Sequence, residues 1–448
     1  MHKSGTKTDV SNYRPISNIC ALSKLYERCV LNRLDEVPFD IQGENQHGFR
    51  TNRGTNTAQV TIQKHLASIM DRKKIALMYS IDMSAAFDLL RADVLEKCTA
   101  DLPEGLQWCI QDFLSERRFQ VALEEFKSRE HTLEVGCVQG SVLGPRLFSI
   151  YCRHLEKTIG KSDAKVVTYA DDSYVMVEGV NIDQLRKKAE SVMKEHNQFL
   201  NSIGMITNPE KTEATIFSKE LHTITLRLDD RVIQTIQSMK VLGLTFNYNL
   251  DWSIHVANCV KKAAGLLGRL RFMRKNLTQE QTLRIITSHY YSMVYYGSPV
   301  WMTSATLSSS EWRLLNTSHY KALRTAVKDV KRRWSRERLN NVCQRATPRE
   351  WAHYGVANLV ASILQSGEPC ELHCAILQEM TINDRMPARP QFYDSSRLKV
   401  GRQAIQNRIS ETAKLIKEDW HSKAISKDQL RIIFKRSFFK CAKDQKCR

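Results

Sequence analysis

Two adjacent aspartates, Asp171 and Asp172, stand in the middle of an apolar, β-branched stretch, VVTYADDSYVMV (166–177). This composition predicts two strands joined by a two-residue turn, with both acids at the turn. Neighbouring carboxylates repel each other, and turns of this kind favour glycine at the second position. A divalent cation such as Mg²⁺ would offset the repulsion, because it prefers oxygen ligands. An Asp-Asp pair alone is also typical of a solvated acidic turn.

A third acid, Asp82, ends a second buried strand, predicted over IALMYSID (75–82). If the two acid-tipped strands lie side by side, Asp82 and Asp171 share one site. Carboxylates in this arrangement can hold two metal ions about 3.5–4 Å apart, which clamp the attacking and leaving oxygens of a phosphoryl transfer. Asp88 lies further along the same segment, and we expect it to begin the next helix as a structural residue.

A glycine-rich loop, GCVQGSVLGPRLF (136–148), lies between these two strands in the sequence. Glycine lets the backbone approach a bulky ligand closely, and Gln139 beside Gly140 can hydrogen-bond a base or sugar edge. The loop is weak evidence by itself. Its place between two acid-tipped strands favours a nucleotide site.

The elements that position these residues are mixed helices and strands. Apolar residues at helical spacing predict helices over 19–35, 57–70 and 182–203, the last one stopped by Gly204. Further strands are predicted over 212–217, 223–228 and 241–246.

Beyond Asp251 the strand signals fade, and capping boxes predict helix starts at Thr278, Ser308 and Thr347. Charge changes at the same place. Residues 1–250 hold 32 Lys and Arg against 32 Asp and Glu, whereas residues 251–448 carry the whole net charge of +19. The two signals together indicate a domain break near 250 and a polyanionic partner, most often nucleic acid.

Two basic runs, 261–275 (KKAAGLLGRLRFMRK) and 328–338 (KDVKRRWSRER), fall on predicted helices. Along a nucleic-acid duplex they would neutralise phosphates, and Trp334 could stack on a base. Such runs are also typical of a solvated helix face or a nuclear-import signal. Residues 401–448 predict a further basic helical tail, to which the sequence assigns no role.

The composition argues against several other classes of protein. Cys370, His373 and Cys374 do not have the spacing of a zinc knuckle or finger, and no Cys-x-x-Cys pair occurs. No run of 18 apolar residues is present, so we expect no membrane span. The apolar share of 42% excludes a wholly disordered chain.

Seven short motifs follow one another along the first part of the chain: NYRPIS (12–17), QHGFR (46–50), IDMSAAFD (81–88), QGSVLGPRLF (139–148), YADD (169–172), NPEKTEA (208–214) and VLGLTF (241–246). In this order they resemble the reverse transcriptase of a non-LTR (LINE-like) retrotransposon. The resemblance implies an α+β fold of the right-hand polymerase type. Its fingers and palm would occupy 1–250, an all-α basic thumb 251–335, and a basic helical C-terminal region 336–448.

The resemblance implies catalytic roles for four residues. Asp82, Asp171 and Asp172 match the aspartates that bind two Mg²⁺ ions, with Mn²⁺ as a possible substitute. Lys211 matches a lysine that protonates the leaving pyrophosphate. By its chemistry alone, an exposed lysine at this place would simply be solvated.

Other positions match residues that contact the nucleotide. Phe87 matches a bulky gate that leaves no room for a 2′-hydroxyl and so favours dNTPs, with ordinary core packing as the alternative. Gln139 and Gly140 match a loop that contacts template and nucleotide. Arg14 matches a triphosphate contact, and Arg50 is a weaker candidate of the same kind.

The resemblance is less complete at the start of the chain and beyond the palm. Lys3 lies where the family has a lysine in the fingers, and residues 241–246 match the hairpin that holds the primer end. From this comparison we expect no counterpart of the endonuclease domain, of the leading strand of the fingers or of a C-terminal zinc knuckle in this sequence.

The expected function is that of an RNA-directed DNA polymerase, which extends a DNA primer on an RNA template with dNTPs and releases pyrophosphate. Two alternatives stay open: a catalytically inactive, nucleic-acid-binding remnant of such a polymerase, and a metal-dependent nuclease that uses the same carboxylates. Because insertion of these elements takes place at chromosomal DNA, nuclear localisation is expected.

Overall fold

The computed structural model describes residues 16–374, except 85, 124, 161–163, 303–305 and 330, together with residues 2, 6, 8, 9, 12 and 13. The described chain forms two compact units, each assembled from separate segments. The first unit contains Met1–Gly54, Leu77–Ala214 and Thr223–Thr235; the second contains Thr55–Ala76, Thr215–His222 and the chain from Ile236 onward. The domain ranges 1–250, 251–335 and 336–448 stay predictions, and the basic tail at 401–448 lies outside the described residues.

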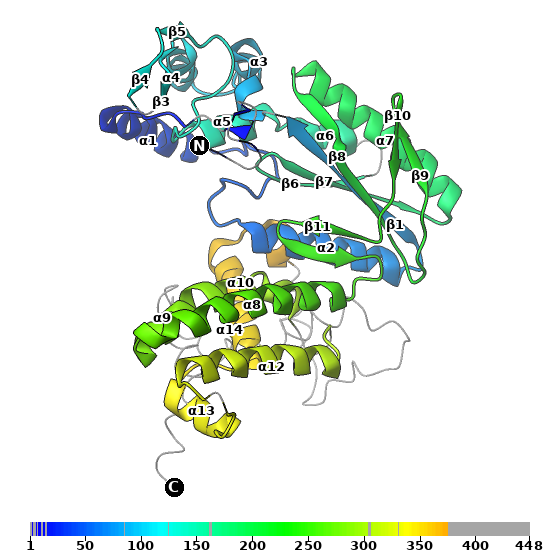
Figure 1. The fold of residues 1–448 in the computed structure, drawn as a ribbon. Coiled ribbons are helices and arrows are strands. Elements are labelled where there is room, and N and C mark those ends of the chain that lie inside the picture. The colour runs from blue at the N-terminus through cyan, green and yellow to red at the C-terminus, as the bar shows by residue number, and fades with distance from the viewer. Residues whose placement is uncertain are drawn as a thin grey trace, which may run out of the picture. The chain divides into compact units, whose positions relative to one another are not determined.

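A four-stranded sheet with the order β6-β7-β1-β8 is the framework of the first unit (Figure 1). The strands are β1 (Ile75–Ser84), β6 (Lys165–Tyr169), β7 (Asp172–Gly179) and β8 (Ile206–Phe217). The middle of β1 is fully buried, as its continuous apolar run predicts. The strands predicted around the three aspartates are therefore confirmed, and the one predicted over 212–217 is the second half of β8. The α+β class is confirmed as well.

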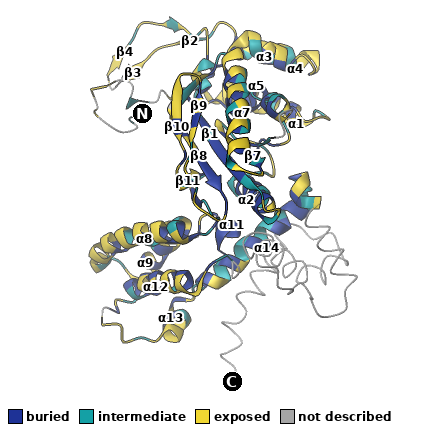
Figure 2. Ribbon diagram, turned by 90° about the vertical axis from the view of Figure 1, so that its right-hand side faces the viewer, coloured by how far each residue is buried: buried dark blue, intermediate teal, exposed yellow. Residues whose placement is uncertain are grey.

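Helix α7 (Ile182–Ser202) packs against β7 and buries its apolar face there (Figure 2). It begins at Asn181, whose side chain accepts a hydrogen bond from the N–H of Gln184, and it ends before Gly204, which has a φ of +77°. This confirms the helix predicted over 182–203. The face of the sheet that carries α7 is thereby covered.

Smaller elements complete the first unit. The helices are α1 (Ala21–Asp35), α3 (Ala92–Cys98), α4 (Glu104–Leu114), α5 (Gly144–Tyr151) and α6 (Leu155–Gly160), with a 3₁₀ turn over Ala86–Leu89. The short strand pairs are β2 (Arg118–Phe119) with β5 (His131–Thr132), β3 (Ala122–Leu123) with β4 (Phe126–Lys127), and β9 (Thr225–Leu228) with β10 (Arg231–Gln234).

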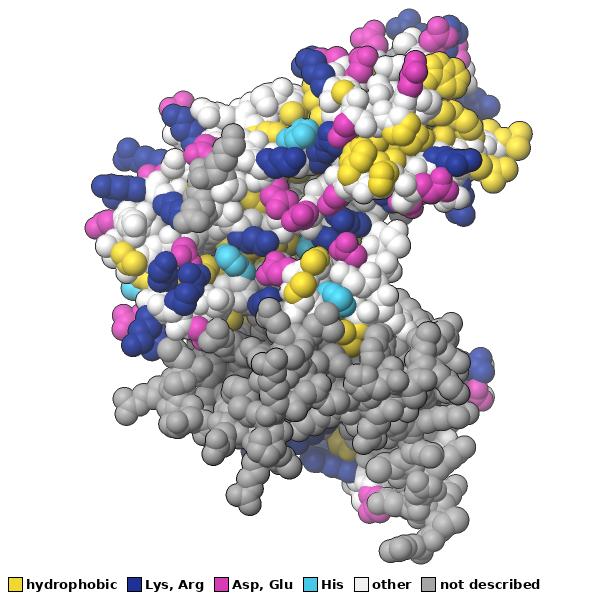
Figure 3. All heavy atoms as spheres, turned by 180° about the vertical axis from the view of Figure 1, so that it is seen from behind, with side chains coloured by type: hydrophobic (Ala, Val, Ile, Leu, Met, Phe, Trp, Pro, Cys, Tyr) yellow, Lys and Arg dark blue, Asp and Glu magenta, His cyan; other side chains and the backbone are white. Residues whose placement is uncertain are grey.

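Helix α1 confirms the helix predicted over 19–35, but its apolar side chains do not all face inward. Leu22 is 76% exposed and Leu25 59%, whereas Glu27 is buried together with Val30. Figure 3 shows hydrophobic side chains gathered on the surface of this part of the unit.

The second unit is mainly helical. Its helices are α2 (Thr55–Asp71), α8 (Ser253–Met273), α9 (Gln279–Ile285), α10 (Ser292–Val294), α11 (Ser298–Trp301), α12 (Ser309–Ala326), α13 (Arg336–Cys343) and α14 (Pro348–Ser366), with a 3₁₀ turn over Arg274–Asn276 and a π-helical turn over Ile286–Tyr291. Helix α2 confirms the helix predicted over 57–70. Capping boxes at Thr278, Ser308 and Thr347 start α9, α12 and α14, as predicted. None of the helices in the described part of the chain has the length and apolar character needed to cross a membrane.

The single strand predicted over 241–246 is wrong. The chain forms a hairpin here, with β11 (Ser238–Val241) antiparallel to β12 (Leu244–Asn247). Leu242 and Gly243 form the turn with φ of +46° and +91°. The carbonyl oxygen of Leu242 accepts hydrogen bonds from the Gln59 side-chain amide at 2.9 Å and the Tyr296 hydroxyl at 3.0 Å, which hold the turn in place. A hairpin at this position is what the family resemblance implies.

Candidate active site

The turn between β6 and β7 is formed by Ala170 and Asp171, one residue earlier than predicted. Tyr169 pairs with Asp172 across the hairpin, so Asp172 is the first residue of β7. Ala170 has a φ of +55°, and a positive φ at this position is what the favoured hairpin turns require. Asp171 therefore lies at the turn, whereas the sheet fixes Asp172.

The three aspartates act on one another electrostatically at one end of the sheet. Asp82 is half-buried near the end of β1, which is the neighbour of β7. Partial burial of the Asp172 carboxyl group, followed by the negative charges of Asp171 and Asp82, raises the pKa of Asp172 to about 6, although the residue as a whole is exposed. The structure therefore brings together the acids that the sequence places on separate strands.

Lys211 joins this group from β8. Its Nζ atom lies 3.3 Å from Oδ2 of Asp82, and its side chain is 67% exposed. An exposed pair of this kind contributes little to stability, but it places a positive charge within the cluster of acids. The role of Lys211 as a proton donor to pyrophosphate stays a prediction.

The chemistry of this donor set fits a divalent cation. Carboxylate oxygens are the ligands that Mg²⁺ and Mn²⁺ prefer, and a cation would relieve the repulsion that adds to the effect of burial on the pKa of Asp172. Within the described ranges, however, no three Asp, Glu, His or Cys side chains are gathered tightly enough to hold an ion as they stand. Asp82, Asp171 and Asp172 would have to close around it, and their assignment as ligands stays a prediction.

Residues 45–48 lie along β6 and reach the catalytic turn. The carbonyl of Asn45 accepts the N–H of Thr168 at 2.9 Å, and the N–H of His47 donates to the carbonyl of Thr168 at 2.8 Å. Gln46, between them, forms a parallel bridge with Thr168. The buried Gln46 side chain accepts the N–H of Ala170 at 3.0 Å and the N–H of Gly48 at 2.7 Å, both through Oε1. This segment therefore contacts the residue immediately before Asp171.

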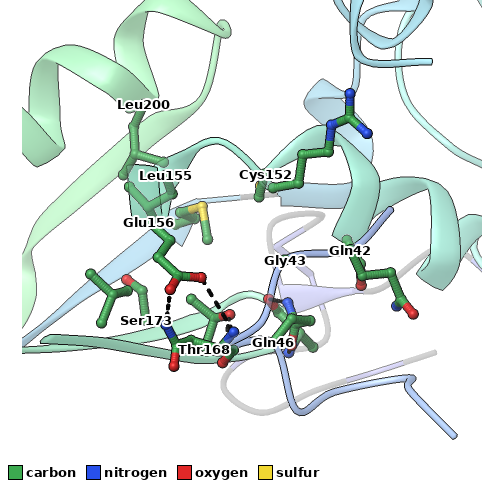
Figure 4. Close-up of a pocket in the computed structure, with 15 residues that line it drawn as sticks. Gln42, Gly43, Gln46, Cys152, Leu155, Glu156, Thr168, Ser173 and Leu200 are labelled. Carbon is green, nitrogen blue, oxygen red and sulfur yellow. Dashed lines mark hydrogen bonds between the residues drawn. The ribbon is translucent and has the colours of Figure 1, made fainter. Parts of the chain in front are cut away.

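A small cavity adjoins the same segment, and Gln46, Cys152, Thr168 and Ser173 are among the residues that line it (Figure 4). Its volume of about 20 Å³ has room for about one water molecule, so it is too small for a substrate. Glu156 lies at its wall and accepts hydrogen bonds from the backbone and side-chain N–H groups of Asn45. Burial raises the pKa of Glu156. The residues around the cavity, Glu156 among them, therefore hold residues 45–48 in place.

The glycine-rich loop packs against the segment that carries Phe87. The Gln139 amide donates a hydrogen bond to Oδ1 of Asp88 at 2.6 Å, and Gly140 has a φ of +117°. The half-buried Phe87 ring lies 4.9 Å from the ring of Phe148, measured between centroids. These contacts place Phe87, Gln139 and Gly140 in one neighbourhood, as the motif order implies, and agree with a structural role for Asp88. The roles of the three in nucleotide binding stay predictions.

Arg50 is held by its own loop. Its Nη1 atom lies 2.9 Å from Oδ2 of Asp40 and donates to the carbonyl of Gly43 at 2.7 Å, and its side chain is 15% exposed. The guanidinium is thus bound to residues 40–43, and a contact with a triphosphate would require these bonds to be exchanged. Arg14 and Lys3 lie outside the described residues.

The sequence analysis gave no role to Glu27 or Gln46. The Glu27 carboxylate is 2% exposed and accepts the N–H groups of Val142 at 2.5 Å and Leu143 at 2.9 Å, which satisfies the start of α5. In the sequence, Glu27 could have been identified as an acid that interrupts the apolar face of a predicted helix. For Gln46 the signal was its place in the QHGFR motif.

The second unit contains a pocket rich in basic side chains, hereafter the basic pocket, with a volume of about 520 Å³. It is lined by Arg271, Arg274, Thr317, Tyr320, Lys321, Arg324, Thr325, Asp329, Arg332 and Arg336. Arg271 and Arg274 come from the first basic run and Arg332 and Arg336 from the second. The two runs are therefore joined in one positively charged hollow.

A single acid, Asp329, orders this pocket. Its carboxylate accepts the N–H groups of Arg333 at 2.8 Å and Trp334 at 3.1 Å and lies 3.4 Å from Nε of Arg324. Burial alone would raise the pKa of Asp329, but these hydrogen bonds and the Arg324 charge hold it below its ordinary value. Because these bonds fold the chain into a turn, the helix predicted across 328–338 is wrong: α13 begins only at Arg336.

Trp334 lies under the guanidinium of Arg338, whose Cζ atom is 4.1 Å from the ring centroid. This is a cation–π contact. Stacking of Trp334 on a base stays a prediction.

Residues 2–246 match the family model described as reverse transcriptase (RNA-dependent DNA polymerase). Among curated proteins, the chain is 27% identical over 376 residues to the RNA-directed DNA polymerase from mobile element jockey of Drosophila melanogaster, covering 79% of this chain and 41% of that protein. It is 25% identical over 338 residues to the probable RNA-directed DNA polymerase from transposon BS of the same species, covering 72% and 37%. The chain thus spans less than half the length of these relatives.

Solved structures similar to this chain include telomerases. Telomerase from Candida tropicalis in complex with a TWJ fragment of telomeric RNA has a TM-score of 0.38 and 12% identity, over 92% of this chain and 56% of that chain. Apo telomerase from the same species, truncated at the C-terminal domain, has a TM-score of 0.36 and 16% identity, over 52% of this chain and 44% of that one.

Proposed function

The chain belongs to the reverse transcriptase (RNA-dependent DNA polymerase) family, and we propose that it extends the 3′-hydroxyl of a DNA primer on an RNA template, using dNTPs and releasing pyrophosphate. Its fold is that of a right-hand polymerase. The observation that carries the proposal is the meeting of Asp82, Asp171 and Asp172 at one end of a sheet, where partial burial, followed by the charges of Asp171 and Asp82, raises the pKa of Asp172. Lys211 adds the positive charge expected beside them.

The protein's own contribution to this reaction is positioning and electrostatics. Asp82, Asp171 and Asp172 would hold Mg²⁺, which when bound activates the primer hydroxyl and stabilises the charge of the leaving pyrophosphate. Asp172 must be ionised for this role, so its raised pKa sets an acid limit to activity. Lys211, exposed beside Asp82, can deliver a proton to the leaving group.

Selection of dNTPs is assigned to Phe87. The ring is braced by Phe148 and half-buried, so it presents a fixed wall rather than a mobile side chain. A wall beneath C2′ of the incoming sugar excludes a 2′-hydroxyl. Gln139 and Gly140, in the same neighbourhood, would contact template and nucleotide, and Arg14 would contact the triphosphate.

The basic pocket supports a nucleic-acid partner for the second unit. Its walls carry several guanidinium groups and one ammonium group, and the one acid among its lining residues, Asp329, is bonded to Arg324 and to backbone N–H groups. Phosphate contacts of this kind make affinity fall steeply with salt, with a log–log slope of about −0.9 for each phosphate neutralised. RNA template and DNA primer are therefore the proposed partners.

Chromosomal insertion by such a polymerase would require the protein to enter the nucleus, and we place its site of action there. A fluorescent fusion of the chain that accumulates in the nucleus would support this location. A fusion excluded from the nucleus during expression of the element would contradict it.

Primer extension tests the proposed function. Wild type and Asp171→Asn are compared on an oligo(dT)-primed RNA with Mg²⁺ and dNTPs, and duplex binding is measured in parallel. Extension by wild type and its loss in the variant, with binding retained, is the expected result. Binding without extension by either protein would indicate an inactive remnant, and degradation of nucleic acid in the absence of dNTPs would indicate a nuclease.

A further inference from the structure

We infer that Gln46 is a positioning residue that fixes the Ala170–Asp171 turn and thereby sets the geometry of the carboxylates. The inference rests on the proposed function, because it concerns the same site. Gln46 lies far from the aspartates in the sequence, but its side chain ends at the residue before Asp171.

The Gln46 carboxamide forms hydrogen bonds through both of its polar atoms. Oε1 accepts from the backbone N–H groups of Gly48 at 2.7 Å and Ala170 at 3.0 Å, and Nε2 lies 3.4 Å from the carbonyl oxygen of Ala170. The side chain therefore contacts both the N–H and the C=O of a single turn residue, Ala170. Gln46 is 4% exposed, so these bonds are shielded from competing water.

These bonds support the backbone conformation of the turn. Ala170 has a φ of +55°, which is costly for a residue with a side chain and persists where its surroundings enforce it. The hairpin itself supplies the pairing of Tyr169 with Asp172. Gln46 supplies additional bonds to Ala170, the turn residue between Tyr169 and Asp171.

The segment that carries Gln46 is itself held in place. Asn45 and His47 are bonded to both backbone groups of Thr168, and Asn45 is anchored at its other side by Glu156. Gly48 follows without a side chain, and a Cβ atom there would lie 2.2 Å from the Ala170 nitrogen. The segment therefore approaches the turn so closely that a shift of one moves the other.

Side chains that orient metal ligands without touching the ion commonly change metal affinity or activity by about 10–100-fold when they are replaced. Gln46→Met keeps the length and volume of the side chain but removes the acceptor oxygen. The matched control is Asn197→Leu. Asn197 is a buried carboxamide of the same unit that bonds Asp229 at 2.7 Å and Thr207 at 3.0 Å, away from the turn.

The first readout is Mn²⁺ binding, measured by electron paramagnetic resonance on the full chain without nucleic acid. Because it needs no turnover, it separates this inference from the proposed polymerase activity. We expect Gln46→Met to weaken Mn²⁺ binding by about tenfold or more. We expect Asn197→Leu to bind Mn²⁺ as wild type does, although both variants lower the midpoint of thermal unfolding. Wild-type affinity in Gln46→Met would overturn the inference and leave Gln46 a packing residue.

The second readout is primer extension, in which kcat should fall in Gln46→Met while KM for dNTP changes little. Gln46→Glu retains an acceptor for both N–H groups and should recover a large part of the lost Mn²⁺ affinity. A failure of recovery with a folded protein would contradict the role of the acceptor oxygen. Should Gln46→Met fail to fold, Gln46→Asn takes its place with the same expected and contradicting results, because its amide is one methylene shorter.

Discussion

The acidic end of the sheet and the basic pocket are both clusters of like charge, but they are held in different ways. Asp82 and Asp172 lie on neighbouring strands, the register of the hairpin fixes Asp172, and Asp171 lies at the turn before it. In the basic pocket, cations from α8, the 3₁₀ turn after it, α12, the chain before α13 and the first residue of α13 meet around Asp329. Among the acids, burial and then the charges of Asp171 and Asp82 raise the pKa of Asp172 even though Lys211 pairs with Asp82, whereas part of the repulsion among the cations is relieved by an internal acid.

This difference indicates what each region is built to receive. A group of acids that still repel one another gains most from a small cation, which can also take part in the reaction. A wide pocket of guanidinium and ammonium groups gains most from an extended polyanion. Damage to the first region should therefore abolish the reaction, and damage to the second should weaken the binding of nucleic acid.

The largest effect is expected from Asp82→Asn. The substitution removes the charge of a proposed metal ligand and the partner of Lys211 while the strand is kept. Loss of several kcal/mol of transition-state stabilisation lowers single-turnover primer extension by about 10³-fold or more. Asp93→Asn is the control, because Asp93 is exposed and paired with Arg91 outside the cluster. Equal loss in both variants would contradict a special role for Asp82.

A smaller effect is expected from the double variant Lys321→Ala/Arg332→Ala in the basic pocket. Each lost phosphate contact should weaken template–primer binding by about tenfold and reduce the salt slope by about one. Fluorescence anisotropy over a range of KCl concentrations measures both quantities. The control removes two exposed lysines of α7, Lys187→Ala/Lys194→Ala. If the two double variants lose affinity equally, net charge rather than the basic pocket determines binding.

The pH dependence of stability should distinguish Asp172 from ordinary surface acids. Its pKa in the folded protein is about 6, above the ordinary value of 3.8, so the folded state holds this proton more tightly than the unfolded state. Its contribution to stability is therefore lost as pH rises from about 4 to about 6. In the absence of divalent ions, the contribution of this residue should lower the midpoint of thermal unfolding of wild type over this pH range. The midpoint of Asp172→Asn should decrease less over the same range.

Divalent ions should reverse this effect in wild type. Mg²⁺ binds the ionised form and stabilises the folded state by mass action, so it should raise the midpoint of thermal unfolding at pH 7.5 more in wild type than in Asp172→Asn. An equal shift in both proteins would show that Asp172 takes no part in ion binding.

The smallest effect is expected at the start of α12, the helix that brings Lys321 and Arg324 to the basic pocket. Ser308 caps this helix and exchanges hydrogen bonds with Glu311. Ser308→Ala should lower the free energy of unfolding in urea by about 1 kcal/mol. Template–primer affinity should not change, because the cap is at the opposite end of the helix. A loss of affinity as large as that of Lys321→Ala/Arg332→Ala would contradict the expectation that this cap affects stability alone.

Local patterns predicted much of the fold and the acids of the site. The apolar run ending in Asp82, the β-branched flanks of Asp171 and Asp172, and the three capping boxes each depend on a few neighbouring residues, and the structure confirms these elements. The one-residue error at the turn arose because Ala170 has an unusual φ for alanine. Its bonds to Gln46 come from a distant segment, and no local pattern contains them.

Side-chain partners across long separations were the features that the sequence did not predict. Gln139 is bonded to Asp88, Arg50 to Asp40, and Glu27 to the start of α5. The charges of 328–338 fit a helix face and therefore predict a helix, whereas Asp329 bonds the backbone N–H groups of Arg333 and Trp334. Such competition between a side chain and the helical backbone is decided by tertiary structure.

Single-turnover extension and template–primer affinity, measured side by side in wild type, Asp171→Asn and Lys321→Ala/Arg332→Ala, separate catalysis from binding. At saturating duplex and Mg²⁺, we expect Asp171→Asn to bind as wild type does but not to extend. We expect the double variant to bind weakly but to extend at nearly the wild-type rate once saturated. Extension by Asp171→Asn at the wild-type rate would contradict the assignment of catalysis to the acidic end of the sheet.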